Sequence, residues 1–261
     1  MATVIKTPYA GTRMKDRPEL VPIYIWEWPV RIFHWGIVVS LLVLTVTGFY
    51  LHLPFLVATG PRAWVMGTTR FVHELFGFIL IAVLISRFYW FFAGNEWAHW
   101  RSWIPLKREQ WQNMKSMILY YTFMRHDLEP EIGHNSLAAS TYTLIVALLV
   151  WECITGLVLY GTVVGSPTLA LLVGWIPRII DIQILRESHY FVMFLFMAFV
   201  IHHVYSALLV SKKQRSGLME SIFTGRKFIT RNVLEEHGVN PETHLHLPRP
   251  GTPSRIQGSP K

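Results

Sequence analysis

A long uncharged run with two histidines is the feature that most limits what this chain can fold into. The run covers residues 188–211 and contains no Asp, Glu, Lys or Arg. A stretch of this length predicts a helix that crosses a membrane. His189 and His203 lie fourteen residues apart within it, so at ~100° and ~1.5 Å per residue the second imidazole comes within ~40° of the first and ~21 Å along the axis. One helix face therefore offers two ligands at two depths of a bilayer.

Three further apolar segments predict the rest of a four-helix bundle, because each is close to the ~20 residues that a bilayer core requires. The four predicted spans are 30–53, 68–92, 135–160 and 187–210. Only 15% of the residues are charged, against ~25% in soluble domains, so we expect an all-α integral membrane protein. The apolar segment 169–184 is interrupted by Pro177, Arg178 and Asp181, which indicates an interfacial segment rather than a fifth span.

The basic residues are unevenly distributed along the chain. Twenty of the 24 Lys and Arg residues lie in 1–31, 87–134 and 212–261, and the two remaining connections hold four. The positive-inside rule then predicts that both termini are cytoplasmic. We expect a cytoplasmic arm at 1–29, a four-helix domain at 30–211 and a cytoplasmic tail at 212–261, which is extended because it is rich in Pro, Gly and Ser. Since the basic residues flank apolar runs, the net charge of +8 indicates membrane orientation and no nucleic-acid partner.

Two other histidines complete two pairs at matched depths. His34 and His73 each lie near the start of a predicted span, and these two spans enter the membrane from opposite sides. Depth matching pairs His73 with His189 on the outer side and His34 with His203 on the inner side. Neutral imidazole is a common axial ligand of heme iron, so the sequence predicts two hemes, each held between two helices. The alternative for any single histidine is an interfacial or hydrogen-bonded role.

Three residues share the faces of the predicted ligands. Gly48 lies fourteen residues after His34, and Gly77 lies one turn after His73. A missing side chain would let a porphyrin approach the backbone, although small residues also permit close helix packing in membranes. Arg87 lies fourteen residues after His73, where it could pair with a heme propionate or extend to the membrane surface as an interfacial arginine.

Other polar residues are candidates for proton or quinone chemistry. Glu152 is an intramembrane carboxylate, which indicates a proton relay, a partner for a charged group, or a structural hydrogen bond to a neighbouring helix. His134 precedes the third span and could interact with a quinone or simply begin the helix. His202 lies ~140° around the helix from His189, so we expect it to face away from the ligands or to handle protons. A short sequence repeat occurs in two predicted spans, as Thr47-Gly48 in the first and Thr155-Gly156 in the third.

Several motifs together resemble one known family. They are Pro29-Val-Arg-Ile-Phe-His34-Trp35, Thr47-Gly48, Arg70-Phe-Val-His73, Arg87-Phe-Tyr-Trp90, Gly94-Asn95, Ile132-Gly-His134-Asn135, His189 and Phe199-Val-Ile-His-His203-Val-Tyr205. Over residues 24–230 the chain resembles the b-type cytochrome subunit of membrane-bound nickel–iron hydrogenases. It departs from the family's pattern at Glu74 and Glu152, where we would expect apolar residues.

The resemblance implies a diheme anchor in the bacterial inner membrane, with His34, His73, His189 and His203 as iron ligands. Such a subunit takes electrons from the iron–sulfur chain of the hydrogenase small subunit, which binds the large nickel–iron subunit, and passes them to a quinone. It belongs to a larger complex and does not itself split hydrogen. Cys153 is the single cysteine, so this chain cannot supply a four-cysteine iron–sulfur cluster.

Two alternatives remain at this point. The gamma-type cytochrome b subunit of formate dehydrogenase, or of another periplasm-facing oxidoreductase, has the same four-helix plan. A transporter or a membrane anchor without redox chemistry belongs to another class, and it would leave the depth matching of the histidines without a purpose.

Overall fold

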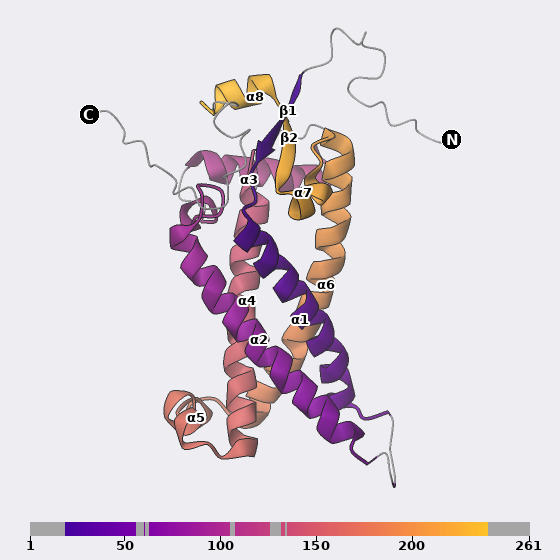
Figure 1. The fold of residues 1–261 in the computed structure, drawn as a ribbon, viewed down its shortest axis with the longest axis vertical. Coiled ribbons are helices and arrows are strands. Elements are labelled where there is room, and N and C mark those ends of the chain that lie inside the picture. Colours follow the sequence, from indigo (N-terminus) through magenta and orange to yellow (C-terminus); the bar gives the residue numbers. More distant parts are fainter. Residues whose placement is uncertain are drawn as a thin grey trace, which may run out of the picture. The chain divides into compact units, whose positions relative to one another are not determined.

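Four long helices dominate the computed structural model, which describes residues 19–55, 60, 63–104, 108–125, 132–133 and 135–239 (Figure 1). They are α1 (Trp28–His52), α2 (Val65–Ala93), α4 (Ser136–Val164) and α6 (Ile182–Gln214). Each is long and apolar enough to cross a membrane, so the four predicted spans are confirmed. All except α1, which ends one residue early, continue beyond the predicted bounds at their C-terminal ends.

Local signals account for both ends of α4. The Asn135 side chain accepts a hydrogen bond from the Ala138 amide at 2.8 Å, which satisfies one of the amides that a helix N-terminus leaves without an intrahelical partner. At the other end Gly165 has a φ of 63°, the left-handed conformation that glycine adopts easily and that commonly ends helices.

The chain divides into two compact units. The larger unit, Trp28–Leu128 with His134–Ser206, contains α1, α2, α4 and most of α6. One buried apolar cluster of this unit consists of Leu80 and Leu84 from α2, Leu149 from α4, and Val192 and Phe196 from α6. Along α6 this apolar layer falls between His189 and His203, and along α2 it falls between His73 and Arg87. The core therefore separates two levels of polar residues.

Shorter helices complete the larger unit. The segment between α2 and α4 contains η3 (Trp100–Ser102) and α3 (Arg108–Tyr121), and α3 packs against α4. The predicted interfacial segment contains α5 (Pro167–Leu172) and η4 (Ile176–Arg178). Among the described residues, no fifth helix reaches the length of a span, as the interrupting Pro177, Arg178 and Asp181 predicted.

The smaller unit contains a two-stranded antiparallel sheet that the sequence analysis missed. Strand β1 (Leu20–Tyr24) pairs with β2 (Arg226–Thr230), with Leu20 opposite Thr230 and Tyr24 opposite Arg226. Helices α7 (Leu218–Thr224) and α8 (Arg231–Glu236) flank β2 in the chain. Its core includes Ile23, Ile25 and Leu234, each with no exposed surface.

This sheet corrects two expectations. The molecule is mostly helical rather than purely α, and the tail is ordered rather than extended as far as residue 239. The strands come from opposite ends of the chain, so the sequence carries no hairpin turn that would signal their pairing. The prolines on which the extended tail was predicted, Pro241, Pro248, Pro250 and Pro253, lie outside the described residues.

Candidate functional site

The first pair of predicted ligands lies between α2 and α6. The ring centres of His73 and His189 are 6.4 Å apart, with an angle of 68° between the ring planes. Each ring also contacts a threonine from one of the other two long helices. Thr47 Oγ1 of α1 lies 2.8 Å from His73 Nδ1, and Thr155 Oγ1 of α4 lies 2.8 Å from His189 Nδ1. All four long helices therefore contribute to this site.

The direction of these hydrogen bonds follows from the second contact of each hydroxyl. Thr47 donates its proton to the Val43 carbonyl at 2.7 Å, and Thr155 donates to the Trp151 carbonyl at 2.9 Å. Each hydroxyl oxygen is then left to accept from the imidazole, so Nδ1 carries the proton. Neutral imidazole has one protonated nitrogen, and Nε2 of both rings is left with a lone pair that can bind a metal.

Glycines next to these threonines keep the rings uncrowded. A Cβ at Gly48 would lie 3.4 Å from His73 Cε1, and a Cβ at Gly156 would lie 3.4 Å from His189 Cε1. The two Thr-Gly pairs in the sequence thus make the same kind of contact, each with one histidine ring. A Cβ at Gly77 would meet nothing within 4 Å, so close helix packing does not account for that glycine.

Glu152 gives the His189 side of this site a second oxygen. Its Oε2 atom lies 2.7 Å from His189 Nδ1, which makes the Glu152 carboxylate a further acceptor for the same N–H. The contact joins α4 to α6, as expected of a buried carboxylate that bonds to a neighbouring helix. The Glu152 side chain is 12% exposed, and its other oxygen, Oε1, is buried without a partner among the described residues.

The second pair of predicted ligands lies between α1 and α6. The ring centres of His34 and His203 are also 6.4 Å apart, with an angle of 46° between the planes. Tyr142 Oη of α4 lies 3.3 Å from His203 Nδ1, and the Phe199 ring stacks on His203 with centres 5.3 Å apart. His34 Nδ1 is buried without a partner in the described part of the chain.

His202 occupies a different face of α6, as its spacing predicted. Its side chain is exposed, and its ring contacts Tyr121 of α3 with centres 6.0 Å apart. The structure thus sets His203, and not His202, opposite His34. His134, the other candidate for quinone chemistry, lies outside the described residues.

Arg87 is buried inside the larger unit rather than extended to its surface. The residue is 7% exposed, its guanidinium lies over the rings of Phe91 and Trp103, and its Nη2 donates to the Ala98 carbonyl at 3.2 Å. Its Nη1 is buried and has no partner among the described residues. An arginine so placed can bind a carboxylate such as a heme propionate.

The separation of the rings tests whether the pairs fit a heme. An imidazole nitrogen binds a transition metal at ~2 Å, and the ring centre lies ~1 Å further away, so two rings on opposite sides of one ion have centres ~6 Å apart. Both pairs match this separation. Among the described residues, no group of three or more His, Cys, Asp or Glu side chains could hold a metal ion. The separation of the rings within each pair suits an iron whose other ligands come from a macrocycle.

The residues that contact the predicted ligands but were not predicted as site residues include Thr47, Thr155, Gly156, Tyr142 and Phe199. The Thr-Gly repeat signalled the first three, but its meaning depends on which rings the two helices face. No sequence pattern marked Tyr142.

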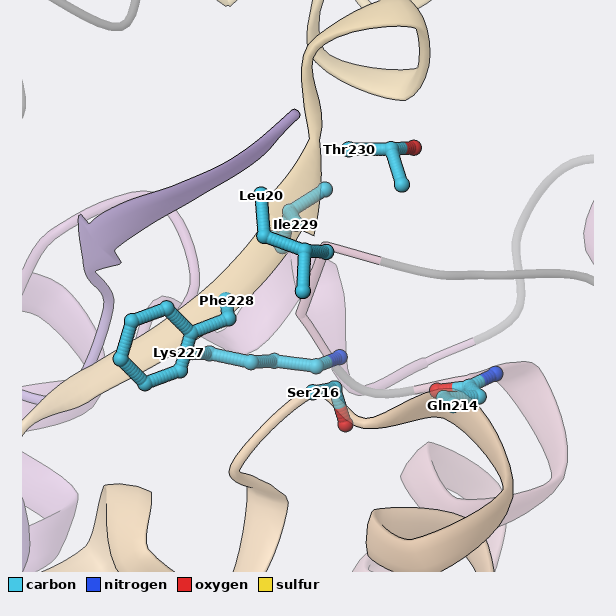
Figure 2. Close-up of a pocket in the computed structure, with 7 residues that line it drawn as sticks. All are labelled: Leu20, Gln214, Ser216, Lys227, Phe228, Ile229 and Thr230. Carbon is cyan, nitrogen blue, oxygen red and sulfur yellow. The ribbon is translucent and has the colours of Figure 1, made fainter. Parts of the chain in front are cut away.

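A shallow pocket in the smaller unit contains none of these histidines. Its lining residues are Leu20, Gln214, Ser216, Lys227, Phe228, Ile229 and Thr230 (Figure 2). The Lys227 ammonium has a structural role in this unit, because the buried side chain donates a hydrogen bond to the Ile132 carbonyl at 3.2 Å.

Comparisons with known proteins identify the family of the chain. The family model described as "Prokaryotic cytochrome b561" matches residues 25–225. A protein of Bradyrhizobium diazoefficiens named "Probable Ni/Fe-hydrogenase B-type cytochrome subunit" is 31% identical, over 84% of this chain and 90% of its own length. A protein of the same name from Rhizobium leguminosarum bv. viciae is 30% identical over 86% and 97%. A "Probable Ni/Fe-hydrogenase 1 B-type cytochrome subunit" of Escherichia coli K12 is 31% identical over 73% and 84%. The chain therefore belongs to the prokaryotic cytochrome b561 family of membrane proteins, as the resemblance in its motifs predicted.

Proposed function

We propose that this chain is the diheme cytochrome b subunit that anchors a nickel–iron hydrogenase and carries its electrons to quinone. The observation that carries this proposal is the equal separation of the two histidine pairs, 6.4 Å between ring centres in each. The names of the relatives favour a hydrogenase partner over the formate dehydrogenase alternative. A transporter would need neither pair.

In this proposal the four histidines hold two hemes b, whose iron supplies the one-electron chemistry. His73 and His189 would hold one heme, with Nε2 of each ring left for iron because Nδ1 is hydrogen-bonded, and His34 and His203 would hold the other. Thr47 fixes the rotation of the His73 ring, and Thr155 fixes the rotation of the His189 ring. Arg87 Nη1, which is buried and has no partner among the described residues, would bind one propionate of the inner heme. Gly48 and Gly77 leave space where the hemes approach the backbone.

The distribution of basic residues gives the path its direction. With both termini cytoplasmic, the His73–His189 pair lies toward the outer face of the inner membrane and the His34–His203 pair toward the cytoplasm. Hemes held by these two pairs would supply one-electron chemistry on either side of the apolar layer, and would carry electrons from the iron–sulfur chain of the small subunit to a quinone. His202 and His134 are the candidates for quinone contact on the cytoplasmic side. The large nickel–iron subunit attaches through the small subunit, in a larger complex.

Hydrogen-driven reduction of the purified complex tests this function. The full chain, isolated with its co-purifying subunits, is expected to show b-type bands in a reduced-minus-oxidised visible spectrum, and hydrogen is expected to reduce those bands without another donor. Added quinone should then reoxidise them. The proposal fails if the complex contains no hydrogenase subunit or if hydrogen leaves the bands oxidised. A matched preparation of a His189→Ala variant is the control, because it retains the inner site.

A further inference from the structure

The outer site contains a Thr-Gly pair twice, and the residue three positions before each threonine differs in charge between the two helices. In α1, Thr47 and Gly48 face His73, and in α4, Thr155 and Gly156 face His189, with the same distances of 2.8 Å and 3.4 Å. Three residues before the threonine, α1 has the apolar Leu44 and α4 has Glu152. Leu44 packs against the apolar core, whereas Glu152 Oε2 approaches His189 Nδ1 to 2.7 Å.

We propose that Glu152 is a positioning residue that lowers the reduction potential of the outer heme through His189. This inference rests on the proposed function, because it requires iron at the Nε2 atoms of His73 and His189. It assigns to Glu152 an electrostatic role that neither Thr155 nor Thr47 can have. It also makes the two hemes unequal, because the inner pair has no carboxylate in contact with either ring among the described residues.

The geometry makes Glu152 an acceptor and not a donor. When iron occupies Nε2, the proton of the neutral ring is on Nδ1, and Nδ1–H is shared between the Thr155 hydroxyl at 2.8 Å and the Glu152 carboxylate at 2.7 Å. Both oxygens come from α4, one helical turn apart. Charge-assisted hydrogen bonds of this kind are stronger than neutral ones, so the ring is fixed in rotation and made a more basic ligand.

A more basic ligand favours the oxidised iron. Ferric iron carries one more positive charge than ferrous iron, and a carboxylate that polarises the ligand stabilises the higher charge more. Low exposure strengthens the effect, because the interaction of charges grows as the local dielectric constant falls. Proteins set redox potentials in part through the groups that hydrogen-bond the other ring nitrogen of a metal-bound histidine. The direction of the effect on the outer heme is therefore downward.

The same contact also explains how a carboxylate persists in a membrane span. A carboxylate without a partner is costly at this position, and the hydrogen bond to His189 Nδ1 offsets that cost on one oxygen. The other oxygen, Oε1, has no partner among the described residues. Burial of this oxygen costs free energy, and packing between helices does not by itself explain why a carboxylate occupies the position.

Redox titration of Glu152→Gln and Glu152→Leu in the full, heme-loaded complex tests the inference. Leu reproduces the residue that α1 has at the matching position. Both variants are expected to retain two hemes, and the outer heme, identified as the one lost in His73→Ala, is expected to titrate at a higher potential. A tenfold change in the reduced-to-oxidised ratio corresponds to 59 mV for a one-electron couple, and we expect a shift of about that size or more.

Thr155→Val and Thr47→Val provide the matched controls, since each removes a neutral hydrogen bond from an outer ligand without removing charge. Their shifts in potential should be smaller than those of the Glu152 variants, and the inner heme should not move in any of the four. An unchanged outer potential with both hemes present would overturn the inference. So would loss of the outer heme in both Glu152 variants, which would make Glu152 a structural residue. Absence of paired hemes in the unsubstituted protein would instead defeat the proposed function.

Discussion

The two histidine pairs of the larger unit have the same separation but different surroundings. At the His73–His189 pair, both Nδ1 atoms contact a threonine at 2.8 Å, and a carboxylate adds a third oxygen. At the His34–His203 pair, the contact from Tyr142 is 3.3 Å long, and His34 Nδ1 has no partner among the described residues. Helix placement thus sets the distance between ligands, whereas neighbouring polar groups set their orientation and charge.

Removal of a histidine ligand should have the largest effect, which is the loss of one heme from one of the two sites. His73→Ala or His189→Ala is expected to abolish the outer heme, and His34→Ala or His203→Ala the inner one, because a lone imidazole cannot clamp the iron from both sides. Quantitation of heme in the purified complex should show the loss of about half of the b-type absorbance.

His202→Ala is the control for these variants, because its exposed ring contacts Tyr121 and neither heme site. It should retain the full heme content. Loss of a heme from His202→Ala, with normal content in His203→Ala, would reverse the choice of ligand on α6.

Removal of the threonine hydroxyls should have the next largest effect, and it should differ between the two helices. In Thr47→Val, His73 Nδ1–H loses the acceptor that fixes it, and a buried donor left without a partner costs ~1–3 kcal/mol. In Thr155→Val, Glu152 still accepts from His189. We therefore expect outer-heme affinity to fall by on the order of tenfold in Thr47→Val and by less in Thr155→Val.

Heme retention during dilution or competition with an apo-heme acceptor protein measures this difference. Equal losses from the two variants would show that Glu152 does not hold His189. A larger loss from Thr155→Val would indicate that its hydroxyl, rather than the carboxylate, dominates the contact with the ring.

A smaller effect is expected from Tyr142→Phe at the inner site. The 3.3 Å distance from Tyr142 Oη to His203 Nδ1 is long for a hydroxyl hydrogen bond, and the remaining ring preserves its packing. We expect both hemes to remain and the inner affinity to change by less than about threefold, which corresponds to the lower part of the ~0.5–1.5 kcal/mol range for a neutral hydrogen bond. Loss of the inner heme would show that this site is held as firmly as the outer one.

The smallest effect should come from the ion pair between Glu19, which precedes β1, and Arg231, the first residue of α8, in the smaller unit. Arg231 Nε donates to Glu19 Oε2 at 2.8 Å, and this hydrogen bond lowers the pKa of the Glu19 carboxyl below its ordinary value. The stabilisation is present above the ordinary pKa and is lost as the pH falls through the lowered one. Because both side chains are exposed, solvent screens the interaction.

Thermal unfolding of the Glu19→Gln variant measures this contribution. The variant is expected to unfold at a slightly lower temperature than the unsubstituted protein at pH 7, and the difference should vanish in acid. Its heme content and potentials should be unchanged, which makes it the baseline for the substitutions at the two histidine pairs.

The positions of the histidines could be predicted from the sequence because helix geometry is regular. Spacing alone selected His203 over His202, and depth alone matched it with His34. Spacing could not show which neighbouring helix would touch each Nδ1 atom. That information depends on how α1 and α4 rotate about their axes, so the roles of Thr47, Thr155 and Glu152 emerged only from the structure.

The missed sheet has a different cause. Residues 20–24 and 226–230 are segments of only five residues each, and each completes its backbone hydrogen bonds by pairing with the other. Pairing between residues about two hundred positions apart leaves no local pattern. The arm and the tail were therefore predicted as separate cytoplasmic extensions.

The heme content of the purified, unsubstituted chain tests the central claim most directly. We expect two hemes b per polypeptide, with b-type absorbance bands and two steps in a redox titration, one of which disappears in His189→Ala. A ratio of one heme or none per polypeptide, or a content that stays at two when His189 is replaced by Ala, would contradict the assignment of the two histidine pairs.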